Sequence, residues 1–301
     1  MKGFTDADVP ALNDQVFLVT GANTGIGLET ARVLAERGAR VLLGCRSAEK
    51  ANAAIESIQD ATPDAAVEHV PLDLGDLDSV REASALVGKE SQLNGLINNA
   101  GIMMPPLEYT EQGFESQFGV NHLGPFALTG LLLPLLMATD DARVVNTSSV
   151  AHRGGNIHFS DINAERGYNR ARRYGQSKLA NLLYSMELQR RLEAAGSSVI
   201  SVGCHPGIAD TELARHMPGL SRLTAPLVSR FFNNSLEGAW PTLMAATSSE
   251  VVGGDYIGPI KRGETAGPAG KAHANRRSRD PELAARLWEL SIEMTGVDPG
   301  I

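Results

Sequence analysis

An apolar run that leads directly into a glycine-rich turn and then a helix constrains the fold of this chain more than any other stretch. Residues 15–20 (QVFLVT) are typical of a buried parallel strand, and residues 28–37 are typical of a helix. Between them stand Gly21, Gly25 and Gly27, spaced as GxxxGxG. A strand, a glycine turn and a helix N-terminus in this order bring backbone N–H groups and the positive end of a helix dipole to one point, where a pyrophosphate can bind. The stretch therefore predicts a dinucleotide-binding turn.

The alternation of strand and helix continues along the chain. Helical segments separate the further predicted strands, which lie at residues 40–45, 67–72, 93–97, 142–147 and 198–204. This pattern indicates an α/β fold with a single Rossmann-type, doubly wound parallel sheet and helices on both faces. No repeat, low-complexity tract or linker interrupts it, so we expect one dinucleotide-binding and catalytic domain over residues 1–301.

The second strand ends at Arg46 and Ser47, about 20 residues after the glycine turn. In a dinucleotide fold this strand end meets the adenosine ribose, where an acidic residue binds the 2′-hydroxyl or an arginine accommodates a 2′-phosphate. No Asp or Glu stands here, and a guanidinium suits a phosphate. We therefore expect NADP(H) as the cofactor; an ordinary surface arginine is the alternative interpretation.

The third and fourth strands end in residues that suit the same ligand. Asp73 and Leu74 follow the third strand, and Asp73 is placed either to meet the adenine ring or to cap the helix predicted at residues 77–87. Residues 98–101 (NNAG) follow the fourth strand. Small residues there let a ligand approach the backbone, while the asparagines can hydrogen-bond across neighbouring strand ends.

Acid–base chemistry is indicated by Tyr174 and Lys178, which lie four positions apart in a helical segment and so project from one face. A fixed ammonium stabilises a phenolate and makes a phenol useful near neutral pH. Taken alone, the pair also fits a half-buried tyrosine beside a solvated lysine. Asn121 lies inside a long apolar helical segment, so it either faces solvent or serves a buried polar site, and Ser149 follows the fifth strand.

Composition excludes several classes of partner. The net charge of −8 argues against nucleic acid and anionic membrane surfaces. Cys45 and Cys204 are too few for a disulfide framework or a metal site, so we expect two core thiols, no metal and a reducing compartment. We expect no N-terminal signal segment and no run of the ~18–20 apolar residues that a membrane span needs, and hence a cytoplasmic protein with no membrane partner.

Together these motifs resemble the short-chain dehydrogenase/reductase family over roughly residues 14–260. Within it, residues 45–47, 150–152 and 174–181 are most similar to retinol-dehydrogenase-like and protochlorophyllide-reductase-like members. The resemblance implies NADP(H)-dependent interconversion of an alcohol and a carbonyl on a fairly apolar small molecule. Two other classes remain as alternatives: a catalytically silent NADP(H)-binding regulatory or scaffold protein, and a methyltransferase with a similar glycine loop.

The resemblance also implies residue roles. Tyr174 would be the general acid in reduction and the base in oxidation, and Lys178 would stabilise the ionised phenol and hold the nicotinamide ribose. Ser149 would hydrogen-bond the substrate oxygen, with Ser148 structural, and Asn121 would hold a water that links Lys178 to solvent. The implied cofactor-binding residues are Gly21, Asn23, Thr24, Gly25, Ile26, Gly27, Arg46, Ser47, Asp73, Leu74, Asn99, Ala100, Gly101, Tyr174, Lys178, Pro206, Gly207 and Thr211.

Some segments depart from the family pattern. An arginine-rich insertion at residues 152–173 is expected to shape one wall of the substrate site or to alter subunit association in a possible homo-oligomer; its arginines could also simply be solvated. Ala209 replaces a bulkier residue. Residues 208–235 predict a substrate lid or, equally, a surface helix pair. Residues 261–301 form a C-terminal extension with an amphipathic helix opened at residues 280–282. We expect no hydrophobic N-terminal anchor, which argues against a dedicated retinoid role.

Overall fold

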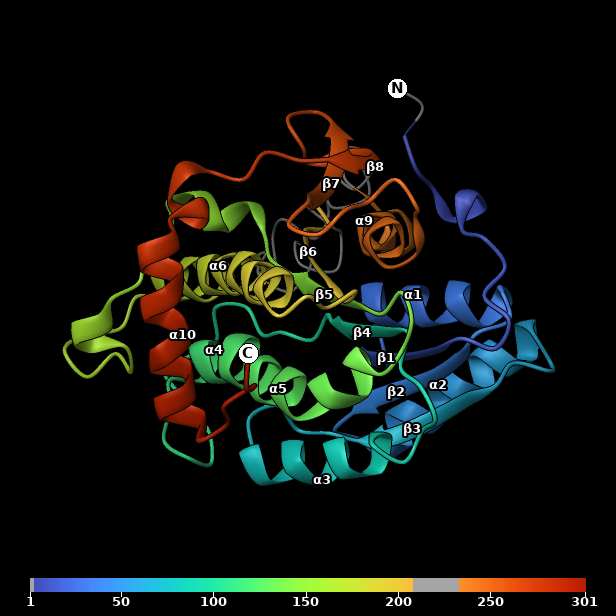
Figure 1. The fold of residues 1–301 in the computed structure, drawn as a ribbon, viewed down its shortest axis with the longest axis horizontal. Helices are drawn as coiled ribbons and strands as arrows, with labels where there is room; N and C mark the ends of the chain where they lie inside the picture. Colours follow the sequence, from blue (N-terminus) through green and yellow to red (C-terminus); the bar gives the residue numbers. More distant parts are fainter. Residues whose placement is uncertain (1–2, 208–232) are drawn as a thin grey trace, which may run out of the picture.

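A sheet of eight strands runs through the middle of the computed structural model, which describes residues 3–207 and 233–301 (Figure 1). The spatial order is β3-β2-β1-β4-β5-β6-β7-β8, and every neighbouring pair is parallel except β7 and β8. The strands are β1 (Val16–Thr20), β2 (Arg40–Cys45), β3 (Val67–Pro71), β4 (Gly95–Asn98), β5 (Arg143–Thr147), β6 (Ile200–Cys204), β7 (Tyr256–Lys261) and β8 (Ala266–Lys271). The doubly wound α/β fold is thereby confirmed.

Helices cover both faces of this sheet, because β1–β6 carry apolar side chains on both sides. On one face lie α1 (Gly25–Glu36), α2 (Ala48–Ala61) and α9 (Ser235–Thr247). On the other lie α3 (Leu77–Val87), α5 (Gly124–Met137) and α6 (Arg170–Ala194). The strand order reverses between β1 and β4, and in such sheets ligands bind in the crevice at this switch point.

The helices begin where a polar side chain can accept a hydrogen bond from a first-turn N–H group. Asp76 caps α3, which rules out Asp73 as the cap of that helix. The caps of the other helices of this kind are Ser47 for α2, Asn169 for α6, Asn234 for α9 and Asp280 for α10 (Pro281–Thr295). The helix α1 is different, since its N-cap residue Thr24 makes no side-chain cap bond.

The C-terminal part of the chain differs in two ways from the sequence-based expectation. The predicted extension at residues 261–301 contains β8, which pairs antiparallel with β7 and completes the sheet. Its sequence, AGPAGK, has no apolar alternation, so neither strand propensity nor pattern signalled it. Of the predicted lid at residues 208–235, residues 233–235 form the capped start of α9, and residues 208–232 lie outside the described chain.

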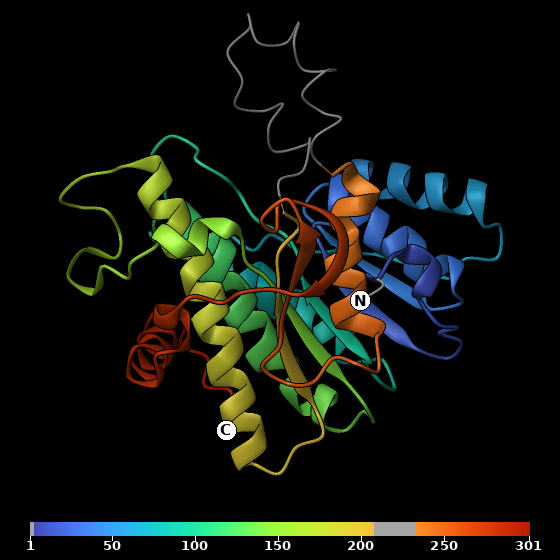
Figure 2. The ribbon, with the colours of Figure 1, turned by 90° about the horizontal axis from the view of Figure 1, so that it is seen from above.

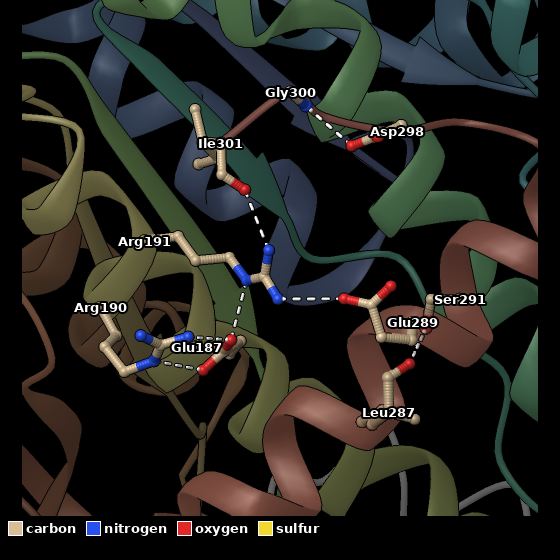
Figure 3. Close-up of polar contacts among 9 residues, drawn as sticks. All are labelled: Glu187, Arg190, Arg191, Leu287, Glu289, Ser291, Asp298, Gly300 and Ile301. Atoms are coloured by element: carbon tan, nitrogen blue, oxygen red, sulfur yellow. Dashed lines mark hydrogen bonds and ion pairs between the residues drawn. The ribbon is translucent and has the colours of Figure 1, made fainter.

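The helix α10 packs along α6 on the side away from the sheet (Figures 1 and 2). Arg191 of α6 anchors it: the guanidinium donates to Glu187, to Glu289 of α10 and to the carbonyl oxygen of Ile301 (Figure 3). The same guanidinium lies 4.4 Å from the ring centroid of Trp288, a cation–π contact. The C-terminal helix is therefore a third layer that is fixed by both packing and charge.

One apolar segment corrects an expectation about membranes. The stretch Ser116–Met137 is long and apolar enough to cross a bilayer by length and composition, contrary to the sequence-based expectation. It comprises α4 (Ser116–Phe118), a π-helical turn (Gly119–Leu123) and α5. Because 67% of its most apolar window is buried inside the protein, it has the character of a core helix.

Candidate active site

The glycine turn after β1 has the backbone geometry that a pyrophosphate cradle requires. Gly21 and Gly25 have φ of 67° and 58°, a conformation that favours glycine. A Cβ on Gly27 would lie 2.4 Å from the carbonyl oxygen of Gly21. Since α1 begins at Gly25 with no side chain capping its first turn, its N–H groups are left for a ligand. These residues therefore fit the pyrophosphate of a dinucleotide.

The ends of β1 and β4 are joined by hydrogen bonds next to this turn. The hydroxyl of Thr20 accepts from the backbone N–H groups of Asn99 and Ala100, each at 3.0 Å, and the Asn99 amide donates to the Thr20 carbonyl at 2.9 Å. Deeper in the sheet, the Asn98 amide donates to Asn146 of β5. The prediction that these asparagines hold neighbouring strand ends together is confirmed.

A cleft of about 640 Å³ opens at the carboxyl ends of β1, β2, β3 and β4. Of the predicted cofactor residues between positions 21 and 101, all except Ser47 line it. Sequence reasoning missed another part of its lining, residues 105 and 108–111, because this loop gives no sequence signal that it lies at the same cleft as the glycine turn. Gly101 and Ile102 also line the cleft.

Arg46 and Asp73 lie together at the mouth of the cleft, with 3.5 Å between the guanidinium and the carboxylate. The Arg46 side chain is 80% exposed, so it is accessible to a phosphate from solvent. Asp73 lines the cleft and accepts from the N–H of Gly75, which leaves adenine contact as its predicted role. The Ser47 hydroxyl instead accepts from Lys50 as the cap of α2.

Tyr174 and Lys178 occupy the first turns of α6 and are both 4% exposed. The Lys178 ammonium lies 5.8 Å from the centroid of the Tyr174 ring and donates to the carbonyl oxygen of Thr147 at 3.2 Å. A Cβ on Gly101 would lie 3.3 Å from the same Nζ atom. The amine thus lies beside the phenol and close to Gly101, which lines the cleft, although neither Tyr174 nor Lys178 is among the residues that line it.

Asn121 is fully buried in the π-helical turn, so of the two alternatives it serves a buried polar site. Its amide oxygen accepts from the N–H of Ile102 at 2.7 Å, and its amide nitrogen donates to the Ile102 carbonyl and to Ser177 of α6, both at 2.9 Å. Asn121 therefore ties the end of the cleft to the helix that carries Tyr174. Single π-helical turns are frequently found at functional sites.

The paired serines after β5 have different surroundings. The Ser148 hydroxyl donates to the Lys178 carbonyl at 2.7 Å, which is a structural contact. The Ser149 oxygen accepts from the N–H of Ala151 at 3.2 Å and opens a short 3₁₀ helix (Val150–Gly154) that packs on α6. Among residues 3–207 and 233–301 its hydroxyl makes no other hydrogen bond, so Ser149 keeps its O–H group as a donor.

Pro206 and Gly207 follow β6 and are buried. Gly207 has a φ of 79°, and a Cβ there would lie 2.4 Å from the carbonyl oxygen of Thr265 in the β7–β8 turn. The turn thus needs glycine for its conformation and for its close backbone contact. Thr211 and Ala209 lie outside the described residues.

The insertion at residues 152–173 is held together by one of its arginines. Arg173 is buried, forms an ion pair with Asp161 at 2.6 Å and donates to the carbonyl oxygen of the same residue. Arg153 pairs with Glu264 of the β7–β8 turn. The remaining arginines of the insertion are solvent-exposed, as the alternative interpretation expected; they are Arg166, Arg170 and Arg172.

Neither cysteine has the character of a catalytic nucleophile. Cys45 and Cys204 are free and buried, as predicted. Burial raises the pKa of the Cys45 thiol to about 11 and also raises that of Cys204, so both remain protonated near neutral pH. Among residues 3–207 and 233–301, no group of three or more His, Cys, Asp or Glu side chains is arranged to hold a metal ion.

Comparison with known sequences places this site among related proteins. The chain matches the model of short chain dehydrogenases over residues 15–218. Retinol dehydrogenase 12 of Homo sapiens is 43% identical over 289 residues, which cover 95% of this chain and 88% of that protein. Retinol dehydrogenase 13 of Homo sapiens is 42% identical over 291 residues, with coverage of 93% and 84%.

Two solved structures share the fold. A protein from Mycobacterium paratuberculosis is 40% identical and superposes with a TM-score of 0.83 over 100% of both chains. The RhlG protein of Pseudomonas aeruginosa, solved as an active-site complex with NADP, is 25% identical and has a TM-score of 0.62 over 82% of this chain and 94% of that one.

Proposed function

This chain belongs to the short-chain dehydrogenase/reductase family, in the branch of the retinol dehydrogenases, and from that premise we propose that it interconverts an alcohol and a carbonyl on an apolar small molecule with NADP(H) as cofactor. The observation that carries the proposal is the position of Lys178. Its ammonium lies beside the Tyr174 ring and close to Gly101, which lines a cleft whose glycine turn fits a dinucleotide.

The chemistry required of the protein is proton transfer and charge stabilisation. Reduction of a carbonyl places negative charge on its oxygen, which a proton donor and a neutral hydroxyl donor together stabilise. Tyr174 supplies the proton and is the base in the reverse direction, while the nearby Lys178 charge favours the ionised phenol. Ser149 donates its O–H group to the carbonyl oxygen of the substrate. This hydrogen remains available because the contact of Ser149 with the N–H of Ala151 uses the hydroxyl oxygen as the acceptor.

The cofactor would be held by the glycine turn, by Arg46 and Asp73 of the same cleft, and by Lys178 close to Gly101. When bound, NADP(H) supplies or accepts the hydride that the protein itself cannot provide. Asn121 fixes the backbone at Ile102, which lines the cleft next to Gly101.

The substrate is proposed from the chemistry of the relatives. Their names refer to retinol, which is an apolar alcohol. The test is therefore a panel of possible substrates. It contains retinal, medium-chain aldehydes and apolar ketones, each assayed with NADPH, and the matching alcohols, each assayed with NADP⁺. We expect cofactor oxidation with at least one carbonyl. NADPH binding without turnover of any member would favour a silent binding protein, and adenosylmethionine binding without NADPH binding would favour a methyltransferase.

The proposed preference for NADP(H) depends on Arg46. We expect Arg46→Ala to raise the KM for NADPH about 10-fold, because a charged hydrogen bond to phosphate is lost, and to change the KM for NADH less than about 2-fold. The matched control is Arg166→Ala, which removes another exposed arginine that does not line the cleft. An unchanged KM for NADPH in Arg46→Ala would show that the 2′-phosphate binds elsewhere.

A further inference from the structure

His152 lies three positions after Ser149, in the short 3₁₀ helix that the serine opens, and the acid–base chemistry gives it no role. Its side chain is fully buried. The Nδ1 atom of the ring lies 2.6 Å from the main-chain carbonyl oxygen of Ser149, and the backbone N–H of His152 donates to the same oxygen at 3.0 Å. One residue therefore holds the backbone of the serine twice.

The hydrogen-bond partner defines the tautomer of this ring. A carbonyl oxygen can only accept, so Nδ1 carries the hydrogen and donates it, while Nε2 carries a lone pair. Burial lowers the pKa of His152, so the ring is neutral near pH 7. His152 thus acts on Ser149 as a neutral hydrogen-bond donor.

An apolar ring would avoid an energetic cost at this position. Within the described part of the chain, the Nε2 atom of His152 is buried and has no hydrogen-bond partner, and an unpaired buried polar atom destabilises the folded state. A phenylalanine would not have this cost. What the imidazole supplies, and phenylalanine cannot, is the donor to the Ser149 carbonyl.

The hydroxyl of the serine depends on the same turn. Its Oγ atom accepts from the N–H of Ala151 at 3.2 Å, and Ala151 stands in the turn that the two bonds from His152 to Ser149 close. Ser149 itself has an extended backbone, with φ of −159° and ψ of 160°, directly before the 3₁₀ helix. A change in this turn would therefore move the hydroxyl as well as the carbonyl.

The imidazole is itself held by Tyr256 of β7. The two rings meet edge to face, with 5.3 Å between their centroids and 87° between their planes, and the Tyr256 hydroxyl oxygen lies 3.3 Å from Nδ1. Tyr256 is buried, and its strand pairs with β6 in the sheet. The imidazole is therefore supported from the sheet.

We propose that His152 is a positioning residue for Ser149: its Nδ1–H group fixes the carbonyl of the serine, and thereby the place from which the Ser149 hydroxyl donates to the substrate oxygen. The inference deepens the proposed function and rests on it, because the role of Ser149 belongs to that function. His152 bonds the backbone of the serine and not the reacting atoms. Tyr256 keeps the imidazole in the position that this bond requires.

Two substitutions of His152 separate positioning from packing. His152→Phe keeps a ring against Tyr256 but removes the donor. His152→Asn keeps a side-chain N–H close to the place of Nδ1 but leaves a cavity, which lowers the melting temperature more. We expect kcat to fall about 10-fold in His152→Phe and about 3-fold in His152→Asn, the reverse of their order in thermal stability.

The matched control is Arg277→Met, which acts on the other end of the same 3₁₀ helix. It removes the hydrogen bond of 2.6 Å from the Arg277 guanidinium to the carbonyl oxygen of Gly155. We expect it to lower the melting temperature and to leave kcat within about 2-fold of wild type. If kcat follows melting temperature across the three variants, His152 has only a structural role and the proposal is wrong.

A double-mutant cycle tests whether His152 acts through Ser149. Ser149→Ala removes the hydroxyl and is expected to lower kcat about 100-fold, the effect of losing one donor to the developing oxyanion. In this background His152→Phe should change kcat by less than about 2-fold, because the group that the imidazole positions is already gone. A further loss of about 10-fold in the double variant would show that His152 affects the rate by another route, and would overturn the proposal.

One measurement does not depend on turnover. In proton NMR spectra the Nδ1–H group, bonded at 2.6 Å, is expected as a slowly exchanging downfield resonance that is present in wild type and Arg277→Met and absent in His152→Phe. Its absence from the wild type would overturn the proposal. A wild type that shows this resonance but turns over no carbonyl would overturn the proposed function, and the role of His152 with it. Turnover by the wild type with independent effects of Ser149→Ala and His152→Phe would overturn the role of His152 alone.

Discussion

Replacing Tyr174 by phenylalanine is expected to lower kcat about 10³-fold, because removal of a general acid and base costs about 10²–10⁴-fold. The ring is 4% exposed and keeps its packing in the variant, with the Lys178 ammonium still over its face. NADPH binding should therefore remain within about 2-fold of wild type. The measurement is kcat with the best carbonyl of the panel, alongside fluorescence titration of NADPH.

The matched control for this prediction is Tyr184→Phe. Tyr184 lies on the same helix and is equally buried, and within the described part of the chain its hydroxyl has no hydrogen bond of standard geometry, so its removal should leave kcat within about 2-fold. Equal rates for wild type and Tyr174→Phe would show that another group transfers the proton. A loss of NADPH binding parallel to the loss of rate would instead assign Tyr174 to cofactor binding.

The parts of this fold that the sequence predicted are those with a local signal. Runs of apolar residues that end at polar or small residues mark where a strand or a helix begins and ends. The strand β2 and the helix α3 accordingly have the bounds that the sequence predicted, residues 40–45 and 77–87. The strand β8 gave no such signal, because glycine and proline make up half of its residues and it forms only by pairing with β7. Its existence depends on a partner, which a single segment of sequence does not reveal.

In the candidate site, too, the residues with a local sequence signal could be predicted, and those that depend on distant contacts could not. Arg46 and the glycine turn could be placed from motif and strand order alone, because parallel strands end at one edge. The sequence could not decide whether Asn121 faces solvent or serves a buried polar site. The fold decides this, because it shows that the asparagine is buried and that it contacts Ile102 and Ser177. Contacts that join distant positions, such as Thr20 with Asn99 or His122 with Ser291, leave no periodicity in the sequence.

The glycine turn also offers a test in which two physical effects oppose each other. Within a helix, replacing glycine by alanine normally stabilises by about 1 kcal/mol. In Gly27→Ala, however, the new methyl group would lie 2.4 Å from the Gly21 carbonyl oxygen and 2.5 Å from the Asn99 amide nitrogen. Relief of this clash must move the turn or the Thr20–Asn99 hydrogen bonds, and overpacking of this kind costs about 1–3 kcal/mol.

We therefore expect Gly27→Ala to weaken NADPH binding about 100-fold, which corresponds to about 2.7 kcal/mol, because the turn and the first N–H groups of α1 are displaced from the pyrophosphate. Calorimetric titration with NADPH measures this effect, and thermal unfolding reports the accompanying loss of stability. Gly154→Ala is the control, since a Cβ there meets nothing within 4 Å and its φ is not positive. If Gly27→Ala binds NADPH as tightly as Gly154→Ala does, the pyrophosphate does not bind at this turn, and the cleft at the β1–β4 switch point would need another ligand.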